Sequence, residues 1–219
     1  RVLFRSVFRG LNLQVTRGER IAAVGNNGTG KTTLLRALAG RLPLREGERV
    51  LGTKVEIGYQ SQDYADEIPP DLTVYGAARE HAVNRSDADV RGLLGGFGFS
   101  GESVEKKVKV LSGGEKVRLA LARLLLRPCN FLILDEPTTH LDIGAREALQ
   151  NALSEYQGTV FLVSHDIEFV RHVAEAIVAL TADGVTRYYG GYDYYRQKMG
   201  DLQSREESES DSGPLSKAE

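Results

Sequence analysis

Three short runs of almost continuous apolar residues, each ending in polar side chains, most constrain how this chain can fold. The runs are "RIAAVG" (Arg20–Gly25), "FLILDEP" (Phe131–Pro137) and "TVFLVSHD" (Thr159–Asp166). Such runs are typical of strands buried on both faces of a parallel sheet. The alternation with helical patterns predicts an α/β fold with helices on both faces of a mostly parallel sheet. The helical patterns cover Lys31–Gly40, Ser112–Leu126, Ile143–Glu155 and Ile167–Ala174.

The two ends of the chain and its middle have different patterns. Residues 3–20 and 176–189 alternate as antiparallel strands do, with turns predicted at Arg17–Gly18 and Asp183–Gly184. Short amphipathic pieces between Gln62 and Leu111 predict a helical subdomain, at about 63–111, inserted in a domain of residues 1–198. Residues 199–219 are rich in serine and acidic residues, which predicts a disordered tail.

The composition limits the classes of function. The chain has 219 residues, 41% hydrophobic residues and a formal net charge of −2, which gives no electrostatic footprint for nucleic acid, DNA or RNA, over the whole chain. A single cysteine, Cys129, fits a reducing compartment, and no apolar run is long enough for a membrane span. We therefore expect a cytoplasmic protein with no membrane contact. The chain starts at Arg1 without an initiator methionine, so we expect it to be a piece of a longer polypeptide.

A glycine-rich loop connects the first predicted strand to the first predicted helix. "GNNGTGKTT" fits G-x-x-x-x-G-K-[ST] in this strand–loop–helix context, which disfavours the alternative of an ordinary Gly/Asn turn. Backbone N–H groups in such a loop surround a phosphate. Lys31 is expected to contact the β- and γ-phosphates and Thr32 to bind Mg²⁺. Phosphate binding is assigned to Gly25, Asn26, Asn27, Gly28, Thr29, Gly30, Lys31, Thr32 and Thr33.

Polar residues at the ends of the other buried runs complete a candidate hydrolytic site. Asp135 ends "FLILD", where a P-loop protein places its Mg²⁺-organising aspartate. Glu136 is expected to point away from the metal and to lie beside the γ-phosphate, because strand side chains alternate in direction. There it would orient an attacking water and accept its proton. His165 follows the third run and is expected beside the γ-phosphate, although a lone histidine is more often structural. Gln62 is a further candidate for contact with Mg²⁺ or the attacking water.

The stretch "LSGGE" predicts a second anion site. Ser112 and Glu115 form a capping box at the start of a helix, and Gly113 and Gly114 leave bare backbone N–H groups at the positive end of its dipole. A helix N-terminus of this kind binds anions. The stretch holds no general base or metal ligand, so the sequence does not by itself say whose anion it receives.

Taken in order, these residues resemble the motifs of ATP-binding-cassette (ABC) ATPases. Gly25–Thr32, Gln62, "LSGGE", "LILDEP", "HLD" and "SHD" are similar to the Walker A, Q-loop, signature, Walker B, D-loop and switch-histidine motifs. The wording of "LSGGEK", "DEPTTHLD" and "YYGGYDYYRQK" resembles the ABC-F class, and within it the C-terminal of two cassettes. Thr139 departs from the usual asparagine.

The resemblance implies a role for the second anion site. In this family two cassettes meet head to tail, and each ATP lies between one Walker A loop and the other cassette's signature. Ser112, Gly113, Gly114 and Glu115 would contact a partner's ATP, and Asp142 would cross the interface. The resemblance implies ATP hydrolysis with Mg²⁺, catalytic roles for Lys31, Glu136 and His165, and a second cassette on the same parent chain or in a homodimer. It also implies action on the ribosome, through the parent protein.

Three alternatives remain open at this point. The chain is also compatible with the motor subunit of an ABC membrane transporter, which would dock on a membrane partner near Gln62. A DNA-repair ATPase of the structural-maintenance type would need a long coiled coil between Walker A and signature, for which 48 residues leave no room. A non-enzymatic interaction module is disfavoured by the intact Lys31, Asp135, Glu136 and His165.

Overall fold

A computed structural model describes residues 8, 10–60, 64–181 and 184–211. The described strands form one six-stranded sheet in the order β2-β3-β4-β1-β5-β6. Neighbouring strands are parallel except for β5 and β6, which pair antiparallel at one edge. This confirms the predicted fold class, a mostly parallel α/β sheet with an antiparallel edge. The strands are β1 (Arg20–Gly25), β2 (Ile57–Gln60), β3 (Phe131–Asp135), β4 (Thr159–Val163), β5 (Ala176–Thr181) and β6 (Gly184–Tyr188).

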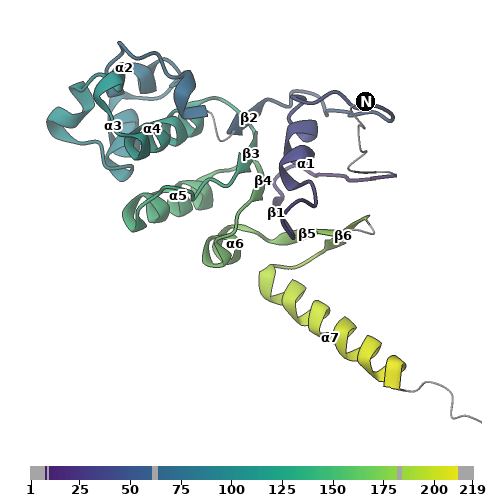
Figure 1. The fold of residues 1–219 in the computed structure, drawn as a ribbon. Coiled ribbons are helices and arrows are strands. Elements are labelled where there is room, and N and C mark those ends of the chain that lie inside the picture. The colour runs from purple at the N-terminus through teal and green to yellow at the C-terminus, as the bar shows by residue number, and fades with distance from the viewer. Residues whose placement is uncertain (1–7, 9, 61–63, 182–183, 212–219) are drawn as a thin grey trace, which may run out of the picture.

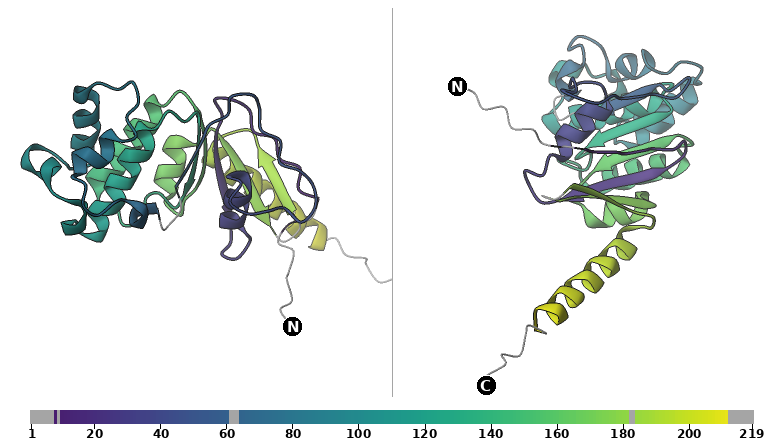
Figure 2. Two further views of the ribbon diagram at one scale, coloured as in Figure 1. Left: turned by 90° about the horizontal axis from the view of Figure 1, so that it is seen from above. Right: turned by 90° about the vertical axis from the view of Figure 1, so that its right-hand side faces the viewer.

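Helices cover both faces of this sheet (Figures 1 and 2). Helix α1 packs on one face through Leu34 and Leu35, together with alternate residues of β1, β3 and β4. Helices α4, α5 and α6 pack on the other face. Both faces of the central strands are therefore buried, as their continuous apolar runs predicted. The bounds are α1 (Lys31–Leu38), α4 (Gly113–Leu126), α5 (Ile143–Glu155) and α6 (Ile167–Val173).

A group of short helices lies beside the sheet and packs against α4 (Figure 1). Ser86 and Asp89 begin α3 with a capping box, and Thr73 caps α2 through its side chain. These helices fall inside the range predicted for the inserted subdomain, but α4 completes their core. The elements are α2 (Val74–Arg79), α3 (Asp87–Gly96) and the 3₁₀ helices η1 (Tyr64–Glu67), η2 (Gly101–Glu105) and η3 (Val108–Val110).

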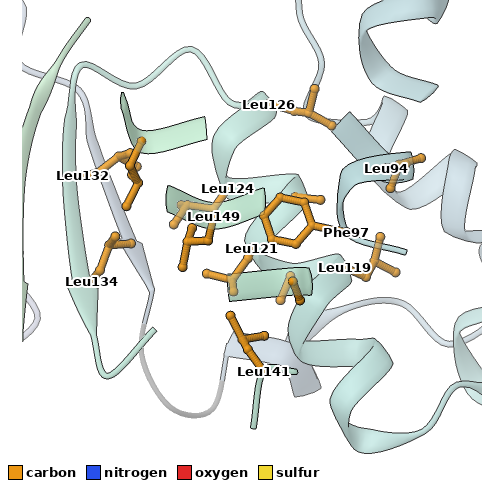
Figure 3. Packing of buried hydrophobic residues seen from close by; sticks show 14 of the residues in the cluster. Leu94, Phe97, Leu119, Leu121, Leu124, Leu126, Leu132, Leu134, Leu141 and Leu149 are labelled. Atoms are coloured by element: carbon orange, nitrogen blue, oxygen red, sulfur yellow. The ribbon is translucent and has the colours of Figure 1, made fainter. Parts of the chain in front are cut away.

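The largest core connects this helical region to the sheet. Leu132 and Leu134 of β3 face the leucines of α4 and α5, while Leu94 and Phe97 approach α4 from the subdomain (Figure 3). Burial of each side chain of this size stabilises the folded state by roughly 1.5–3 kcal/mol relative to leaving it exposed. Helix α4, whose N-terminus carries the signature residues, is therefore held by the sheet and the subdomain together.

Two predictions at the chain ends were wrong over part of their range. Residues 10–19 form no strand, although Leu13 and Val15 pack on the α1 face of the sheet and the turn at Arg17–Gly18 is present. Alternating apolar residues can bury one side without ladder hydrogen bonds, which explains the mistaken strand. The remaining residues of that prediction, 3–7 and 9, lie outside the described residues, as does Asp183 of the second turn.

The C-terminal segment also differs from its prediction. Residues 199–211 belong to helix α7 (Tyr192–Asp211), which leaves the sheet domain (Figure 2), whereas disorder was predicted from 199. Tyr192 and Tyr195 pack against the core, and Tyr188 Oη lies 3.6 Å from Met199 Sδ. The first turns of the helix are therefore held against the sheet domain. The Glu, Gln and Arg residues that follow have high helix propensity, so the helix continues. Residues 212–219 lie outside the described part.

Candidate functional site: a phosphate-binding loop at the sheet edge

The carboxyl ends of β1, β3 and β4 meet at one edge of the sheet. In the strand register Val163 pairs with both Ala23 of β1 and Asp135 of β3. The loop that follows β1 therefore lies beside the residues that follow β3 and β4. This edge is where open α/β sheets bind ligands.

Glycine is required where the loop leaves β1. A Cβ atom at Gly25 would lie 2.4 Å from the backbone oxygen of Leu180 on β5, so no other residue fits this close approach. Gly28 and Gly30 have φ angles of 83° and 98°, in the left-handed region that glycine adopts most easily. Thr29 Oγ1 donates to Asn26 O at 2.9 Å and closes the turn. The loop is thus shaped by its own residue types.

The loop leads into the N-terminus of α1, which has no acidic residue in its first turn. Lys31 Nζ donates to the backbone oxygens of Gly25 at 2.8 Å and Asn26 at 3.1 Å, so the ammonium group lies over the loop. Free backbone N–H groups, a helix N-terminus and this positive charge together favour a bound phosphate.

Thr32 and Asp135 lie side by side although 103 positions separate them. Thr32 Oγ1 donates to Asp135 Oδ1 at 3.3 Å. Asp135 is only 2% exposed, and this burial, opposed in part by the hydrogen bond from Thr32, raises the pKa of its carboxyl group. A bound cation would stabilise the buried carboxylate. Hydroxyl and carboxylate oxygens are the donors that Mg²⁺ prefers, so this pair fits a magnesium site.

No cluster of three or more His, Cys, Asp or Glu side chains that could hold a metal occurs among the described residues. A magnesium ion at Thr32 and Asp135 would therefore need water and phosphate oxygens as its other ligands, which is the usual arrangement for Mg²⁺ with nucleotides. Gln62, the third predicted metal ligand, lies outside the described residues.

Glu136 faces the same cavity as Asp135, for a reason that the sequence analysis missed. Strand β3 ends at Asp135, and Glu136 adopts a left-handed backbone with a φ of 51°, while its N–H donates to Val163 O at 2.9 Å. Strand alternation therefore stops at Asp135, and the left-handed backbone at Glu136 sets the direction of its side chain. A strained non-glycine backbone of this kind is a feature often found at functional sites.

His165 holds one oxygen of the Glu136 carboxylate. The His165 backbone N–H donates to Glu136 Oε2 at 3.0 Å, and His165 Nε2 lies 3.4 Å from Glu136 Oε1. The second contact is not a hydrogen bond. Oε1 is buried and has no hydrogen-bond partner in the described part of the chain. One oxygen is thus fixed and the other is left available as an acceptor.

These groups surround a single open cavity of about 340 Å³. Its lining joins the loop, the Mg²⁺ pair, Glu136 and His165, so the structure brings together the candidates that come from three separate strands. Gly25, Asn26 and Thr29 support the loop without lining the cavity. The lining residues are Asn27, Gly28, Gly30, Lys31, Thr32, Thr33, Asp135, Glu136, Val163 and His165.

The signature residues lie elsewhere. Ser112 Oγ accepts the Glu115 N–H at 3.3 Å, and Ser112 donates both its N–H and its hydroxyl to Glu115 Oε2 at 2.8 Å, which confirms the capping box. These hydrogen bonds, the backbone one foremost, lower the pKa of the Glu115 carboxyl group. The cavity lining includes none of the four signature residues Ser112, Gly113, Gly114 and Glu115. Gly113 is exposed and Gly114 is half-buried. The chain thus carries two separate candidate anion-binding elements.

Asp142 caps α5 and contacts the helix that bears the signature. Its Oδ1 accepts the Ala145 N–H at 2.8 Å, and its Oδ2 lies 3.0 Å from Arg118 NH1 on α4. Arg118 and Arg146 were not among the predicted residues. Arg146 pairs with Asp166, beside His165, at 3.1 Å. Each follows a motif on a helix by four to six positions, but this spacing does not reveal the distant partner.

A phosphate-binding loop, a buried aspartate after a second strand and a glutamate–histidine pair are the features of a P-loop nucleotide-binding domain. The family model described as ABC transporter matches residues 8–139. The chain therefore belongs to the ABC transporter family, and it is one of that family's ATPase cassettes. The described residues contain no helix with the length and apolarity needed to cross a membrane.

Curated relatives lie in the F branch of this family or carry ATP-binding names. The chain is 44% identical over 188 residues to YdiF, a putative ATP-binding protein of Bacillus subtilis, and 39% identical over 203 residues to ABC transporter F family member 5 of Arabidopsis thaliana. It is 39% identical over 201 residues to ATP-binding cassette sub-family F member 3 of Pongo abelii. These alignments cover 86%, 92% and 91% of the chain but only 29%, 29% and 28% of the relatives.

Solved structures share the fold. A dimeric bacterial ABC transporter cassette superposes with a TM-score of 0.68 at 24% identity, over 84% of this chain and 90% of the other. An archaeal ribosome recycling factor, solved with a ribosomal stalk protein, gives a TM-score of 0.67 at 27% identity, over 86% of this chain and 38% of the other.

Proposed function

We propose that this chain binds ATP with Mg²⁺ and hydrolyses its γ-phosphate bond at the cavity between the Gly25–Thr33 loop and Glu136. The observation that carries the proposal is the Glu136 carboxylate, whose Oε2 is fixed by the His165 N–H. Its Oε1 is buried in the same cavity as the phosphate loop and accepts no hydrogen bond from the described residues. A carboxylate oxygen so placed can orient a water molecule and accept its proton.

The other residues bind and position the triphosphate. Loop N–H groups and Lys31 neutralise the phosphate charge, and Thr32 and Asp135 would hold Mg²⁺, which supplies further charge neutralisation when bound. The His165 imidazole, at the rim of the cavity, is placed to donate a hydrogen bond toward the terminal phosphate. In this arrangement Glu136 is the one residue of the cavity to which we assign the orientation and deprotonation of the attacking water.

A second cassette is the proposed partner, because the signature of this chain lies outside the chain's own cavity and is free to contact a nucleotide bound to another cassette. Two large apolar side chains are exposed in the segments that carry the signature and Asp142: Val110 is 66% exposed and Ile143 is 73% exposed. A Cβ at Gly114 would lie 3.7 Å from His140 O, so both segments belong to one surface. Exposed apolar side chains beside bare backbone donors fit a surface that closes onto another protein's bound anion.

At the level of the whole protein, we propose a tandem ABC-F protein of the cytoplasm that closes with ATP on the ribosome. Support comes from the F-family names of its relatives and from the small share of their length that this chain spans. We place this chain as the C-terminal cassette, with its domain at 1–198 and its helical subdomain at about 63–111. Closing is a population shift, since only the closed pair completes both ATP sites.

The first test asks whether the ATP-bound protein, with hydrolysis blocked, associates with ribosomes. The full-length protein with Glu136→Gln, together with the matching change in the other cassette, is incubated in cell extract with ATP or ADP and then sedimented. Co-sedimentation with ribosomes in ATP but not in ADP supports the proposal. Retention in the soluble fraction, or sedimentation with membranes, contradicts the ribosomal part, whereas phosphate release at the wild-type rate contradicts the catalytic part.

A further inference from the structure

The turn that carries His165 is fastened to β3 by hydrogen bonds. Ser164 Oγ accepts the Asp166 N–H at 3.1 Å and lies 3.0 Å from Thr138 Oγ1 in the segment after β3. His165 donates its backbone N–H to Glu136 Oε2. The position of the Glu136 carboxylate therefore depends on the backbone of this turn.

The same turn is fastened to α5 by an ion pair. Asp166 Oδ1 accepts the Phe169 N–H at 3.1 Å and caps α6, while its Oδ2 lies 3.1 Å from Arg146 NH1. The Asp166 side chain is 18% exposed and that of Arg146 is 38% exposed, so solvent screens the contact only in part. Arg146 is itself placed by its N–H, which donates to Asp142 O at 3.0 Å in the first turn of α5.

Removal of Arg146 would loosen the turn. Helix α6 has seven residues, and a helix this short depends on its cap, which is worth about 1 kcal/mol. An Asp166 carboxylate without its guanidinium partner gains free energy by turning toward water. It would then leave the Phe169 N–H, and the backbone at His165 would gain freedom.

We propose that Arg146 is a positioning residue for hydrolysis: through Asp166 it fixes the turn that carries His165, and the His165 N–H in turn fixes the Glu136 carboxylate. This inference rests on the proposed ATPase function of the same site. Arg146 does not line the cavity and contacts no reacting atom. Its contribution is transmitted through Asp166 and His165 in sequence.

The first measurement does not depend on activity. In the full-length protein, hydrogen exchange of the peptide that contains His165 is compared for wild type, Arg146→Gln and Arg171→Gln. Arg171 is a matched control, because it lies on α6 but pairs with Glu168 of the same helix and with Asp193 of α7, away from Asp166. Arg146→Gln is expected to speed exchange at His165 by roughly ten-fold, in line with the loss of about 1.4 kcal/mol of local stability, and Arg171→Gln is expected to leave it unchanged. Unchanged exchange in Arg146→Gln would overturn the proposal.

The second measurement is a double-mutant cycle on ATP hydrolysis. Arg146→Gln is expected to lower kcat about ten-fold with KM changed less than about two-fold, and Arg146→Lys to restore most of the rate. In a Glu136→Gln background, Arg146→Gln is expected to have little further effect, since the carboxylate that Arg146 helps to position is already absent. Full additivity of the two losses would overturn the positioning role. Absence of hydrolysis in the wild type would instead contradict the proposed function, and the exchange measurement would still decide the role of Arg146.

Discussion

The backbone N–H of His165 donates to Oε2 of Glu136 at 3.0 Å, which ties the end of one buried strand to the carboxylate that follows its neighbour. The bond leaves the imidazole of His165 free of that task, so the side chain is available to the cavity. The same residue therefore contributes in two ways: its backbone N–H orients the carboxylate, and its side chain lines the cavity.

This relationship makes Glu136→Gln the most informative single change. The amide keeps the shape and can accept the His165 N–H, but it is too weakly basic to take a proton from water. We expect hydrolysis to fall by at least about 100-fold, with ATP affinity nearly unchanged. Phosphate release and nucleotide binding are measured side by side. The control is Glu147→Gln, a change at an exposed residue of α5. Equal losses of binding and turnover would argue against a catalytic base.

Lys31→Ala tests the phosphate loop. The ammonium group that now contacts Gly25 O and Asn26 O would be lost, and with it a charged hydrogen bond to phosphate. Such bonds contribute about 1.5–3 kcal/mol, so ATP affinity is expected to fall roughly 10- to 100-fold. Titration with a fluorescent ATP analogue measures the change, and exposed Lys107→Ala serves as the control. Unaltered affinity would place the phosphates elsewhere.

Ser112 allows stability and closure to be separated. Ser112→Ala removes the cap on the Glu115 N–H and is expected to cost about 1 kcal/mol, or roughly 2–4 °C in Tm. Ser112→Arg is expected to leave nucleotide binding at the Gly25–Thr33 loop intact while it blocks closure onto a second cassette. Thermal melting and ATP-dependent association are the readouts. If Ser112→Arg associated as the wild type does, the signature surface would not be the closing face.

Glu115 gives a pH-dependent prediction. Its hydrogen bonds with Ser112 lower its pKa in the folded state below the unfolded value of 4.5, so the ionised carboxylate stabilises the fold above that pH. This contribution is lost as the pH falls through the lowered folded-state pKa. Glu115→Gln keeps the capping geometry without the charge. At pH 7 it is expected to lower the free energy of unfolding by up to about 1 kcal/mol, and therefore to melt at a lower temperature than the wild type. The two melting curves should converge in acid; a constant difference at all pH values would point to geometry and not charge.

Local sequence was sufficient for the elements that hold the loop and the signature. The apolar runs at Phe131–Asp135 and Thr159–Val163 predicted buried parallel strands, because only burial on both faces permits such runs. Ser112 and Glu115 predicted their own capping box, because both partners lie in one helical turn. The Gly25–Thr33 loop carries its geometry in its glycines. These features depend on neighbours a few positions apart.

Other features were decided by tertiary structure. The left-handed backbone at Glu136, which turns its carboxylate into the cavity, depends on the hydrogen bond to Val163 of the next strand and has no signal in the residue type. The Arg146–Asp166 pair joins two helices, and α7 continues past Met199 because its first turns pack on the core. The sequence by itself therefore determined which groups this protein carries and the local turns that present them. Only the long-range register of the sheet and the packing of α5 and α6 decided how those groups face one another, because hydrogen bonds and ion pairs between distant segments leave no periodic pattern along the chain.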